Sequence, residues 1–326
     1  MAHHRLLGLL AVKEGKDMQA NQIVLKTQGL TKYFGKRRII NNISFEVGAG
    51  EIFGFLGPNG SGKTTTIKMI LGLLDIDAGK VYIGGCDREK DFENALRQIG
   101  GIIENPDTYG YMTGYQNLIY YSRLRGKLDR ARIDEVVRLV GLENRIHDKV
   151  KTYSLGMKQR LGLAQAIVHR PKVLVLDEPT NGLDPAGMRE LRDTLKYLAA
   201  SEGIAVFVSS HILSEMQLLC DRVCIISAGT VLRTCNVEEL LDEQSHGYRF
   251  ILRPADTAEA VISRLFQGRM LARQGDIFDL ACQEDEVPSI IAQLMQNGTA
   301  VYGVQPAVRS LEDSFMEITG GGNTIA

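Results

Sequence analysis

The stretch Gly57-Pro58-Asn59-Gly60-Ser61-Gly62-Lys63-Thr64 matches the pattern G-x4-G-K-[ST], which is typical of a loop that binds phosphate groups. The segment Glu51–Leu56 before it, which is apolar after its first residue, has the composition of a buried strand, and Thr64–Leu73 after it has the pattern of a helix. Phosphate-binding loops of this kind join a strand to a helix, so the flanking segments support the motif. The sequence therefore predicts a nucleotide-binding site at this loop.

The loop contains the residue types that phosphate binding requires. Its three glycines let the backbone turn tightly, so that successive N–H groups converge on phosphate oxygens, and the following helix adds its positive N-terminus. Lys63 can reach the β- and γ-phosphates, and the Thr64 hydroxyl can coordinate Mg²⁺. The predicted nucleotide-binding residues of this segment are Gly57, Pro58, Asn59, Gly60, Ser61, Gly62, Lys63, Thr64 and Thr65.

Two acids follow a second apolar run, Val173–Leu176, and form a further part of the predicted site. A wholly apolar strand belongs in the middle of a parallel sheet, where its carboxyl end opens on the ligand crevice. At that end Asp177 is placed to hold Mg²⁺, directly or through water, and Glu178 is placed to orient or deprotonate an attacking water. A strand that ends in two acids is common by itself, but together with a phosphate-binding loop it indicates nucleotide hydrolysis.

Strand-like runs alternate with helical patterns from Ile23 to about Leu232, which predicts an α/β domain with a largely parallel sheet. Beyond Leu232 a short helical pattern, Val237–Glu243, comes first, and the three short strand-like runs and three helical patterns that follow are typical of a small α+β domain. We assign residues 1–22 to an N-terminal extension, 23–232 to the nucleotide-hydrolysing domain, 233–247 to a linker, 248–319 to the α+β domain and 320–326 to a glycine-rich, disordered tail. The expected strands outside the site include Ile23–Thr27, Ile43–Glu46, Ala205–Ser209, Tyr248–Arg253, Ile277–Ala281 and Val301–Gln305, and the expected helices include Arg130–Val140, Ser154–His169, Met188–Ala200, Ala258–Phe266, Val287–Gln296 and Leu311–Ile318.

The first 17 residues have the features of upstream sequence rather than of a targeting segment. The apolar run Leu6–Val12 is short, and charged residues occupy the place where a signal peptide has its cleavage site. The codons for Lys13-Glu14-Gly15 can spell a purine-rich bacterial ribosome-binding sequence shortly before Met18. We therefore expect translation to start at Met18, with residues 1–17 read in frame from upstream.

The composition, with 44% apolar and 24% charged residues among 326, is that of a globular protein of about two domains. It excludes a disordered tail protein, a collagen-like rod and a disulfide-stapled miniprotein. With 38 Lys and Arg against 39 Asp and Glu, the net charge of −1 predicts no nucleic-acid partner. The longest apolar runs are shorter than the roughly 20 residues of a spanning helix. Five scattered cysteines without a CxxC pair indicate buried thiols in a reducing cytosol.

Four further motifs occur in an order that is typical of one protein family. They are the segment Leu30–Gly35 with its aromatic pair, the signature segment Tyr153–Arg160, the D-loop Asn181–Pro185, and the triplet Ser209-Ser210-His211 at a strand end. Together with the phosphate-binding loop and the two acids, they resemble the nucleotide-binding subunit of an ATP-binding-cassette (ABC) transporter over about Ile23–Leu232. The resemblance implies an α/β fold of the P-loop NTPase class: an ABC cassette with a mixed-sheet core and a helical subdomain, followed by the small C-terminal α+β domain.

The resemblance also implies how these motifs act on ATP and Mg²⁺. Two cassettes, either a homodimer or a pair of closely related chains, close head to tail around two ATP molecules. The phosphate-binding loop, Asp177 and the catalytic pair Glu178 and His211 of one chain then face the signature residues of the other. Those residues are Ser154, Leu155, Gly156 and Met157, with Asp184 in the D-loop. By itself, Ser154 is also the expected N-cap of a helix, and both roles can coexist.

Two positions of the family pattern remain open or differ in this chain. For the ring that stacks on adenine, Phe34 is favoured because it directly precedes Gly35, while Tyr33 is the alternative. In the Q-loop segment Gly100–Pro106, Glu104 stands where a glutamine is usual, and it is a further candidate ligand of Mg²⁺. A carboxylate only accepts hydrogen bonds and adds a charge beside the phosphates. The alternative is an exposed loop glutamate without a role.

The signature segment differs too, because Leu155 replaces the first of two usual glycines and Met157 replaces a glutamine. With Glu104 and the C-terminal domain, this signature resembles the bacitracin-resistance and lantibiotic-immunity exporters. The resemblance implies a separately encoded membrane-spanning subunit, bound near Asn105–Tyr121, and a cytoplasmic chain held peripherally on the inner face of the membrane. Alternatives are an exporter ATPase for another drug or lipid and a soluble ABC ATPase of translation or DNA repair. A nucleotide sensor without hydrolysis is disfavoured by Glu178 and His211.

Overall fold

The computed structural model describes residues 22–124, 126, 128–242, 247–307 and 311–318. This part of the chain forms two compact units, which meet in sequence between Val237 and Glu238; the second unit ends at Glu317. Residues 1–21 and the expected tail 320–326 lie outside the described residues, as does the proposed start at Met18. No helix in the described ranges combines the length and the apolar content that crossing a membrane requires.

The first unit is built around a six-stranded sheet with the strand order β10-β9-β3-β8-β7-β6. Its strands are β3 (Ile52–Leu56), β6 (Ile99–Ile102), β7 (Val173–Asp177), β8 (Ala205–Ser210), β9 (Arg222–Ser227) and β10 (Thr230–Asn236). All neighbours pair in parallel except β9 and β10, which are antiparallel. Every residue of β3, β7 and β8 is buried, as expected for apolar strands in the middle of a parallel sheet. The predicted α/β core with a mixed sheet is confirmed.

A second, antiparallel sheet of the first unit has the order β2-β1-β4-β5. Its strands are β1 (Ile23–Phe34), β2 (Arg37–Gly48), β4 (Ala78–Ile83) and β5 (Cys86–Asp87). The first two strands are longer than expected, because their cross-strand pairing continues through irregular register into polar segments. Phe45 of this sheet joins the two layers: its ring centroid lies 5.4 Å from that of Phe53 and 5.3 Å from that of Phe207 in the core sheet.

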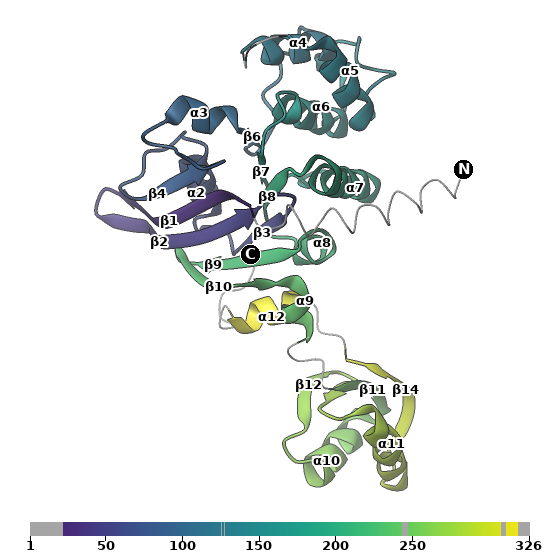
Figure 1. Cartoon of the computed structure of the whole chain (residues 1–326). Helices are drawn as coiled ribbons and strands as arrows, with labels where there is room; N and C mark the ends of the chain where they lie inside the picture. Colours follow the sequence, from purple (N-terminus) through teal and green to yellow (C-terminus); the bar gives the residue numbers. More distant parts are fainter. Residues whose placement is uncertain (1–21, 125, 127, 243–246, 308–310, 319–326) are drawn as a thin grey trace. The chain divides into compact units, whose positions relative to one another are not determined.

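The helices of the first unit are α2 (Lys63–Ile70), α3 (Phe92–Arg97), α4 (Gly114–Leu124), α5 (Arg130–Leu139), α6 (Leu155–Ile167), α7 (Pro185–Glu202), α8 (Leu213–Leu219) and the 3-10 helix η1 (Val150–Thr152). Helices α4, α5 and α6 gather beyond β6 at one end of this unit (Figure 1). They form the helical subdomain that the family resemblance implied. Helix α7 begins three residues before its predicted start, because Asp184 caps it and Pro185 suits its first position.

The second unit contains the sequence β11 (Tyr248–Arg253), α10 (Ala255–Leu265), β12 (Met270–Gln274), β13 (Ile277–Leu280), η2 (Glu284–Glu286), α11 (Val287–Gln296), β14 (Ala300–Pro306) and α12 (Leu311–Ile318). Its antiparallel sheet has the order β12-β13-β11-β14. Side chains of the sheet, α10 and α11 enclose one apolar core, for example Phe250, Ile262 and Leu294. This is an α+β arrangement, as the sequence predicts. Strand β12 escaped prediction because all five of its residues are exposed and lack an alternating pattern.

The expected linker 233–247 differs in its first part from the structure. Residues 233–236 complete β10, because antiparallel pairing with β9 continues as far as Asn236 opposite Arg222. Helix α9 (Val237–Asp242) follows directly, where the sequence predicts a short helix over Val237–Glu243. The division between the two units therefore falls five residues after the expected boundary at Leu232.

Candidate functional site

The phosphate-binding loop follows β3, and its conformation requires glycine at the three predicted positions. Gly60 and Gly62 have φ angles of 77° and 107°, in the left-handed region that side chains rarely adopt. At Gly57 a Cβ atom would lie 2.5 Å from the carbonyl oxygen of Ile226. The chain therefore makes a tight turn before α2, whose N-terminus supplies free N–H groups for an anion.

Lys63, the first residue of α2, lies folded over the loop with only 7% of its surface exposed. Its Nζ donates a hydrogen bond of 2.8 Å to the carbonyl oxygen of Gly57 and lies 3.6 Å from Oε1 of Glu178. The ammonium group thus stands between the phosphate-binding loop and the predicted catalytic acid. This position gives it access to a phosphate that is bound by the loop.

Thr64 and Asp177, two of the predicted ligands of Mg²⁺, contact each other. The Thr64 hydroxyl donates a hydrogen bond of 2.9 Å to Oδ2 of Asp177, although 113 residues separate them in sequence. Asp177 is 1% exposed, and its Oδ1 accepts a hydrogen bond from the Ser209 hydroxyl. A hydroxyl and a carboxylate are the hard oxygen ligands that Mg²⁺ takes in proteins, where it also keeps waters and substrate phosphates. These two residues fit a magnesium site.

Glu178 and His211, the predicted catalytic pair, also lie together. His211 Nδ1 is 2.7 Å from Oε2 of Glu178. The backbone of Glu178 has a φ of 51°, an uncommon value for a residue other than glycine, and its N–H donates to the carbonyl oxygen of Ser209 at 3.1 Å. His211 is 46% exposed, so its ring borders solvent on the side away from Glu178. The pair stands at the carboxyl edge of the sheet, where ligands bind in α/β folds.

Ser209 belongs to this cluster and was not singled out as a site residue from the sequence. It contacts both acids and is completely buried. The available signal was its place in an apolar strand just before the predicted histidine, where a hydroxyl needs a polar partner. Neither the motif spacing nor the strand pattern indicates that this partner is Asp177.

The aromatic segment at the end of β1 is held by Asp77. The N–H of Tyr33 donates to Oδ2 of Asp77 at 2.6 Å, and Nζ of Lys32 contacts its Oδ1 at 3.0 Å. These two contacts hold the pKa of the Asp77 carboxyl below its usual range, with the Tyr33 N–H as the larger cause. Both candidate rings are exposed, Phe34 by 52% and Tyr33 by 44%, so each is accessible to an adenine base.

Glu104 follows β6 at the same edge of the sheet. Pairing of Ile102 with Leu176 aligns β6 and β7 in parallel, so position 104 continues toward the level of Glu178. The residue is exposed and has a φ of 58°. The structure thus brings the Q-loop position to the catalytic edge of the sheet.

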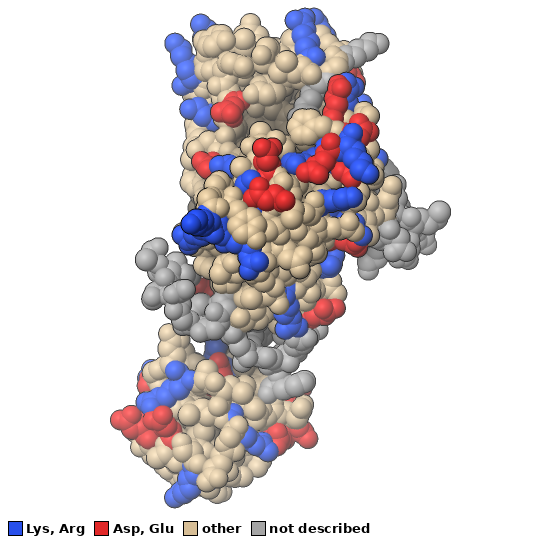
Figure 2. All heavy atoms as spheres, turned by 90° about the vertical axis from the view of Figure 1, so that its left-hand side faces the viewer, with Lys and Arg blue, Asp and Glu red and all other residues tan. Residues whose placement is uncertain are grey.

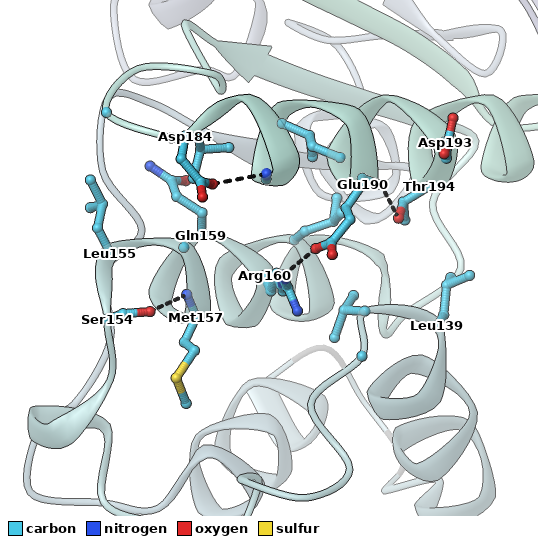
Figure 3. A pocket seen from close by; sticks show the side chains of 18 of the residues that line it. Leu139, Ser154, Leu155, Met157, Gln159, Arg160, Asp184, Glu190, Asp193 and Thr194 are labelled. Carbon is cyan, nitrogen blue, oxygen red and sulfur yellow. Dashed lines mark hydrogen bonds and ion pairs between the residues drawn. The ribbon is translucent and has the colours of Figure 1, made fainter.

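The signature residues and the D-loop line a separate hollow of about 730 Å³ between α6, α7 and the end of α5 (Figure 3). Ser154 caps α6, accepting a hydrogen bond of 3.3 Å from the N–H of Met157, and Asp184 caps α7 in the same way. Leu155 lies against Gly182, since a Cβ there would come within 2.6 Å of its side chain. The hollow's lining includes Gly156 and none of the phosphate-binding loop, so one chain does not bring the two halves together.

The similarities of the chain to known proteins agree with this geometry. Residues 40–181 match the model of the family described as ABC transporter. The chain is 47% identical over 297 residues to the uncharacterized ABC transporter ATP-binding protein YhcH of Bacillus subtilis (strain 168), covering 91% of this chain and 96% of that protein. It is 38% identical over 309 residues to the bacitracin transport ATP-binding protein BcrA of Bacillus licheniformis, covering 92% and 98%.

Among solved structures, cbiO1 from Clostridium perfringens, described as part of the ABC transporter complex cbiONQ, superimposes with a TM-score of 0.63. It is 26% identical in sequence, and the match covers 76% of this chain and 97% of that one. The fold, the shared motifs and the near full-length relatives lead to one conclusion. The chain belongs to the ATP-binding subunits of ABC transporters, and it is an ATPase with the P-loop NTPase fold.

Proposed function

We propose that this ATPase powers an exporter that removes antimicrobial peptides of the bacitracin or lantibiotic kind, in resistance or in self-immunity. The observation that carries the proposal is the extent of the similarity to BcrA, which reaches 98% of that protein and so includes the C-terminal unit as well as the cassette. An exporter of another drug or a lipid is the alternative with the same chemistry. A soluble ABC ATPase of translation or DNA repair is a more distant one.

In the proposed site, each residue of the cassette has its own role in binding ATP and Mg²⁺ or in hydrolysis. The N–H groups of the loop and Lys63 bind the phosphates, and the Thr64 hydroxyl and Asp177 Oδ2, 2.9 Å apart, hold Mg²⁺. The metal, when bound, neutralises charge on the β- and γ-phosphates. Glu178 orients or deprotonates the attacking water, and His211 contacts the γ-phosphate with the ring edge that faces away from Glu178. Glu104, at the same edge of the sheet, would add a further carboxylate as a candidate ligand of Mg²⁺.

Hydrolysis requires a second chain in this proposal, either an identical copy or a closely related cassette. Ser154 and Gly156 lie at the N-terminus of α6, where free N–H groups can bind a phosphate. They border the hollow that Figure 3 shows, apart from the phosphate-binding loop of their own chain. Head-to-tail pairing would bring them to the γ-phosphate held by the other chain.

The membrane-spanning partner would contact the segment 105–121, which follows the Q-loop. A groove of about 390 Å³ lies there, lined largely by apolar residues such as Leu71, Leu73 and Pro106, with Tyr121 at its border. A short helix of a membrane subunit fits a groove of this kind. The chain would then be cytoplasmic and peripheral on the inner face of the membrane.

On the face in Figure 2, acidic and basic side chains are interspersed over the first unit, without a continuous basic stripe.

A deletion strain tests the proposal. Loss of the gene should raise sensitivity to bacitracin-like or lantibiotic peptides, and wild-type protein should restore resistance while Glu178→Gln should not. The chain should copurify with a multispanning membrane protein. Unchanged peptide sensitivity together with membrane copurification would favour another exported substrate, and stable association with ribosomes would favour the soluble class.

A further inference from the structure

Ser209 lies at a junction of three strands. On β8 it is paired with Asp177 of β7 on one side and with Phe55 of β3 on the other. Strand β7 carries the two acids, and β3 leads into the phosphate-binding loop. The residue is completely buried, so its hydroxyl must find its partners within the protein.

The Ser209 hydroxyl contacts the carboxylate of Asp177 and the backbone N–H of Glu178 at the same time. It donates a hydrogen bond to Oδ1 of Asp177 and accepts one of 3.2 Å from the N–H of Glu178. The Ser209 carbonyl oxygen accepts from the same N–H at 3.1 Å. A serine hydroxyl has a single proton to donate, and here that proton is directed to a carboxylate.

The hydrogen bond from the Ser209 hydroxyl determines the orientation of the Asp177 carboxylate. Because Ser209 engages Oδ1, rotation of the carboxylate would break a charge-assisted hydrogen bond. The other oxygen, Oδ2, is thereby directed to the Thr64 hydroxyl, 2.9 Å away. Oδ2 and Thr64 Oγ1 are the two atoms to which we assign the metal.

We propose that Ser209 is a positioning residue, whose hydroxyl presents Asp177 Oδ2 to Mg²⁺ and helps to hold Glu178 in its left-handed conformation. The inference rests on the proposed magnesium role of Thr64 and Asp177. The alternative is a serine that only fills space in the sheet. The two roles differ in what they require: positioning requires a hydrogen-bond donor, and packing requires only volume.

Three substitutions separate these roles. Ser209→Ala removes donor and volume, Ser209→Cys keeps the volume but donates weakly, and Ser209→Thr keeps the donor. Thr27→Val is the control, since Thr27 is also buried and its hydroxyl accepts the Phe45 N–H at 3.0 Å in the antiparallel sheet. Thermal unfolding identifies any variant that does not fold. The affinity for ATP is measured in EDTA and at increasing concentrations of Mg²⁺. The kcat and KM of ATP hydrolysis are measured for the same variants.

We expect Ser209→Ala and Ser209→Cys to bind ATP in EDTA like the wild type but to need more Mg²⁺ for half-saturation. Their kcat should fall by about 10- to 100-fold, the range for a lost hydrogen bond to a charged group. Ser209→Thr should retain more of both properties than either, and Thr27→Val should match the wild type in both. The dependence of ATP affinity on Mg²⁺ concentration is a binding measurement, so it does not depend on the rate of ATP hydrolysis.

Several results would overturn the role of Ser209. These are an Ala variant with wild-type Mg²⁺ dependence and kcat, rescue by Cys but not by a folded Thr variant, or an equal loss of ATP affinity with and without Mg²⁺. Failure of the underlying metal assignment looks different. In that case the wild type itself would bind ATP with an affinity that does not respond to Mg²⁺, and the role of Ser209 would fall with it.

Discussion

Oε2 of Glu178 lies 2.7 Å from Nδ1 of His211, across 33 positions of sequence. An ionised carboxylate can only accept, so the hydrogen bond requires the imidazole proton on Nδ1. The other ring nitrogen, Nε2, is then free to face a ligand. Because His211 follows β8 and Glu178 follows β7, the parallel pairing of these strands brings the two residues together.

Glu178→Gln should bind ATP with near wild-type affinity and hydrolyse it at least about 100-fold more slowly, because an amide cannot take a proton from water. ATP should then hold the variant as a closed dimer. Light scattering with and without ATP measures the oligomeric state. Glu143→Gln, a change at an exposed glutamate, is the matched control. A Glu178→Gln chain that stays monomeric at saturating ATP would contradict the head-to-tail arrangement.

Glu104→Gln should keep ATP binding and change either the rate of hydrolysis or its coupling to the membrane partner. An amide can donate as well as accept, and it removes a negative charge at the carboxyl edge of the sheet. ATP turnover and peptide resistance are measured in parallel with those of the wild type. If both are unchanged, Glu104 is an exposed loop residue without a part in the cycle.

Phe34→Ala should weaken ATP binding by about tenfold, in the range for the loss of one base–aromatic stack. Tyr33→Ala should have a smaller effect on ATP affinity, because Phe34 is the favoured stacking ring. The substitution also leaves the hydrogen bond from the backbone N–H of residue 33 to Asp77 in place, so the segment keeps its position. Equilibrium binding of ATP to both variants decides between the two rings. The reverse ranking would assign the stack to Tyr33, and equal wild-type affinities would mean that neither ring contacts adenine.

Glu202→Gln should lower the free energy of unfolding by about 2 kcal/mol, within the range for a lost hydrogen bond to a charged group, because the buried Arg132 loses a partly exposed carboxylate partner. Arg132 of α5 is 2% exposed, and its Nη2 lies 2.9 Å from Oε2 of Glu202 at the end of α7. Without that carboxylate the exposed Glu135 is the one acidic partner that the buried guanidinium keeps among the described residues.

Denaturant unfolding measures this loss, and Arg97→Met is its control. Arg97 pairs with Glu93 on an exposed helix surface, where an ion pair contributes less than about 1 kcal/mol. Equal effects of the two substitutions would show that the Arg132–Glu202 pair does not stabilise the joint between α5 and α7.

Cys220 and Cys224 should resist alkylation in the folded protein at pH 8. Burial raises the pKa of Cys224 to about 12, and it raises the pKa of Cys220 as well, so little reactive thiolate is present at pH 8. Cys86 is only partly buried and should react first. Mass spectrometry of the alkylated protein, with and without denaturant, locates the labels. Rapid labelling of Cys220 under native conditions would show that α8 opens readily.

Much of the fold could be predicted because its strongest signals are local. Strands β3, β7 and β8 are continuous apolar runs, and α11 has amphipathic spacing, so their positions follow from the sequence pattern. The sequence pattern does not predict strands β4, β5, β6, β9, β10 and β12. Each is defined by the partner with which it pairs, and β12 lies exposed at a sheet edge.

The sequence by itself determined the phosphate-binding loop, the order of the motifs and the family. The turn that binds phosphate requires glycines at fixed positions, and the acids follow directly after an apolar strand, so both features can be recognised in a short stretch of sequence. Only the tertiary structure decided that Ser209 contacts both acids, that Thr64 meets Asp177, and that Leu155 packs on Gly182. These contacts join residues that lie 27 to 113 positions apart, and strand register and helix packing determine them. Local patterns along the chain do not reveal these contacts, because each one depends on how two distant segments pack together.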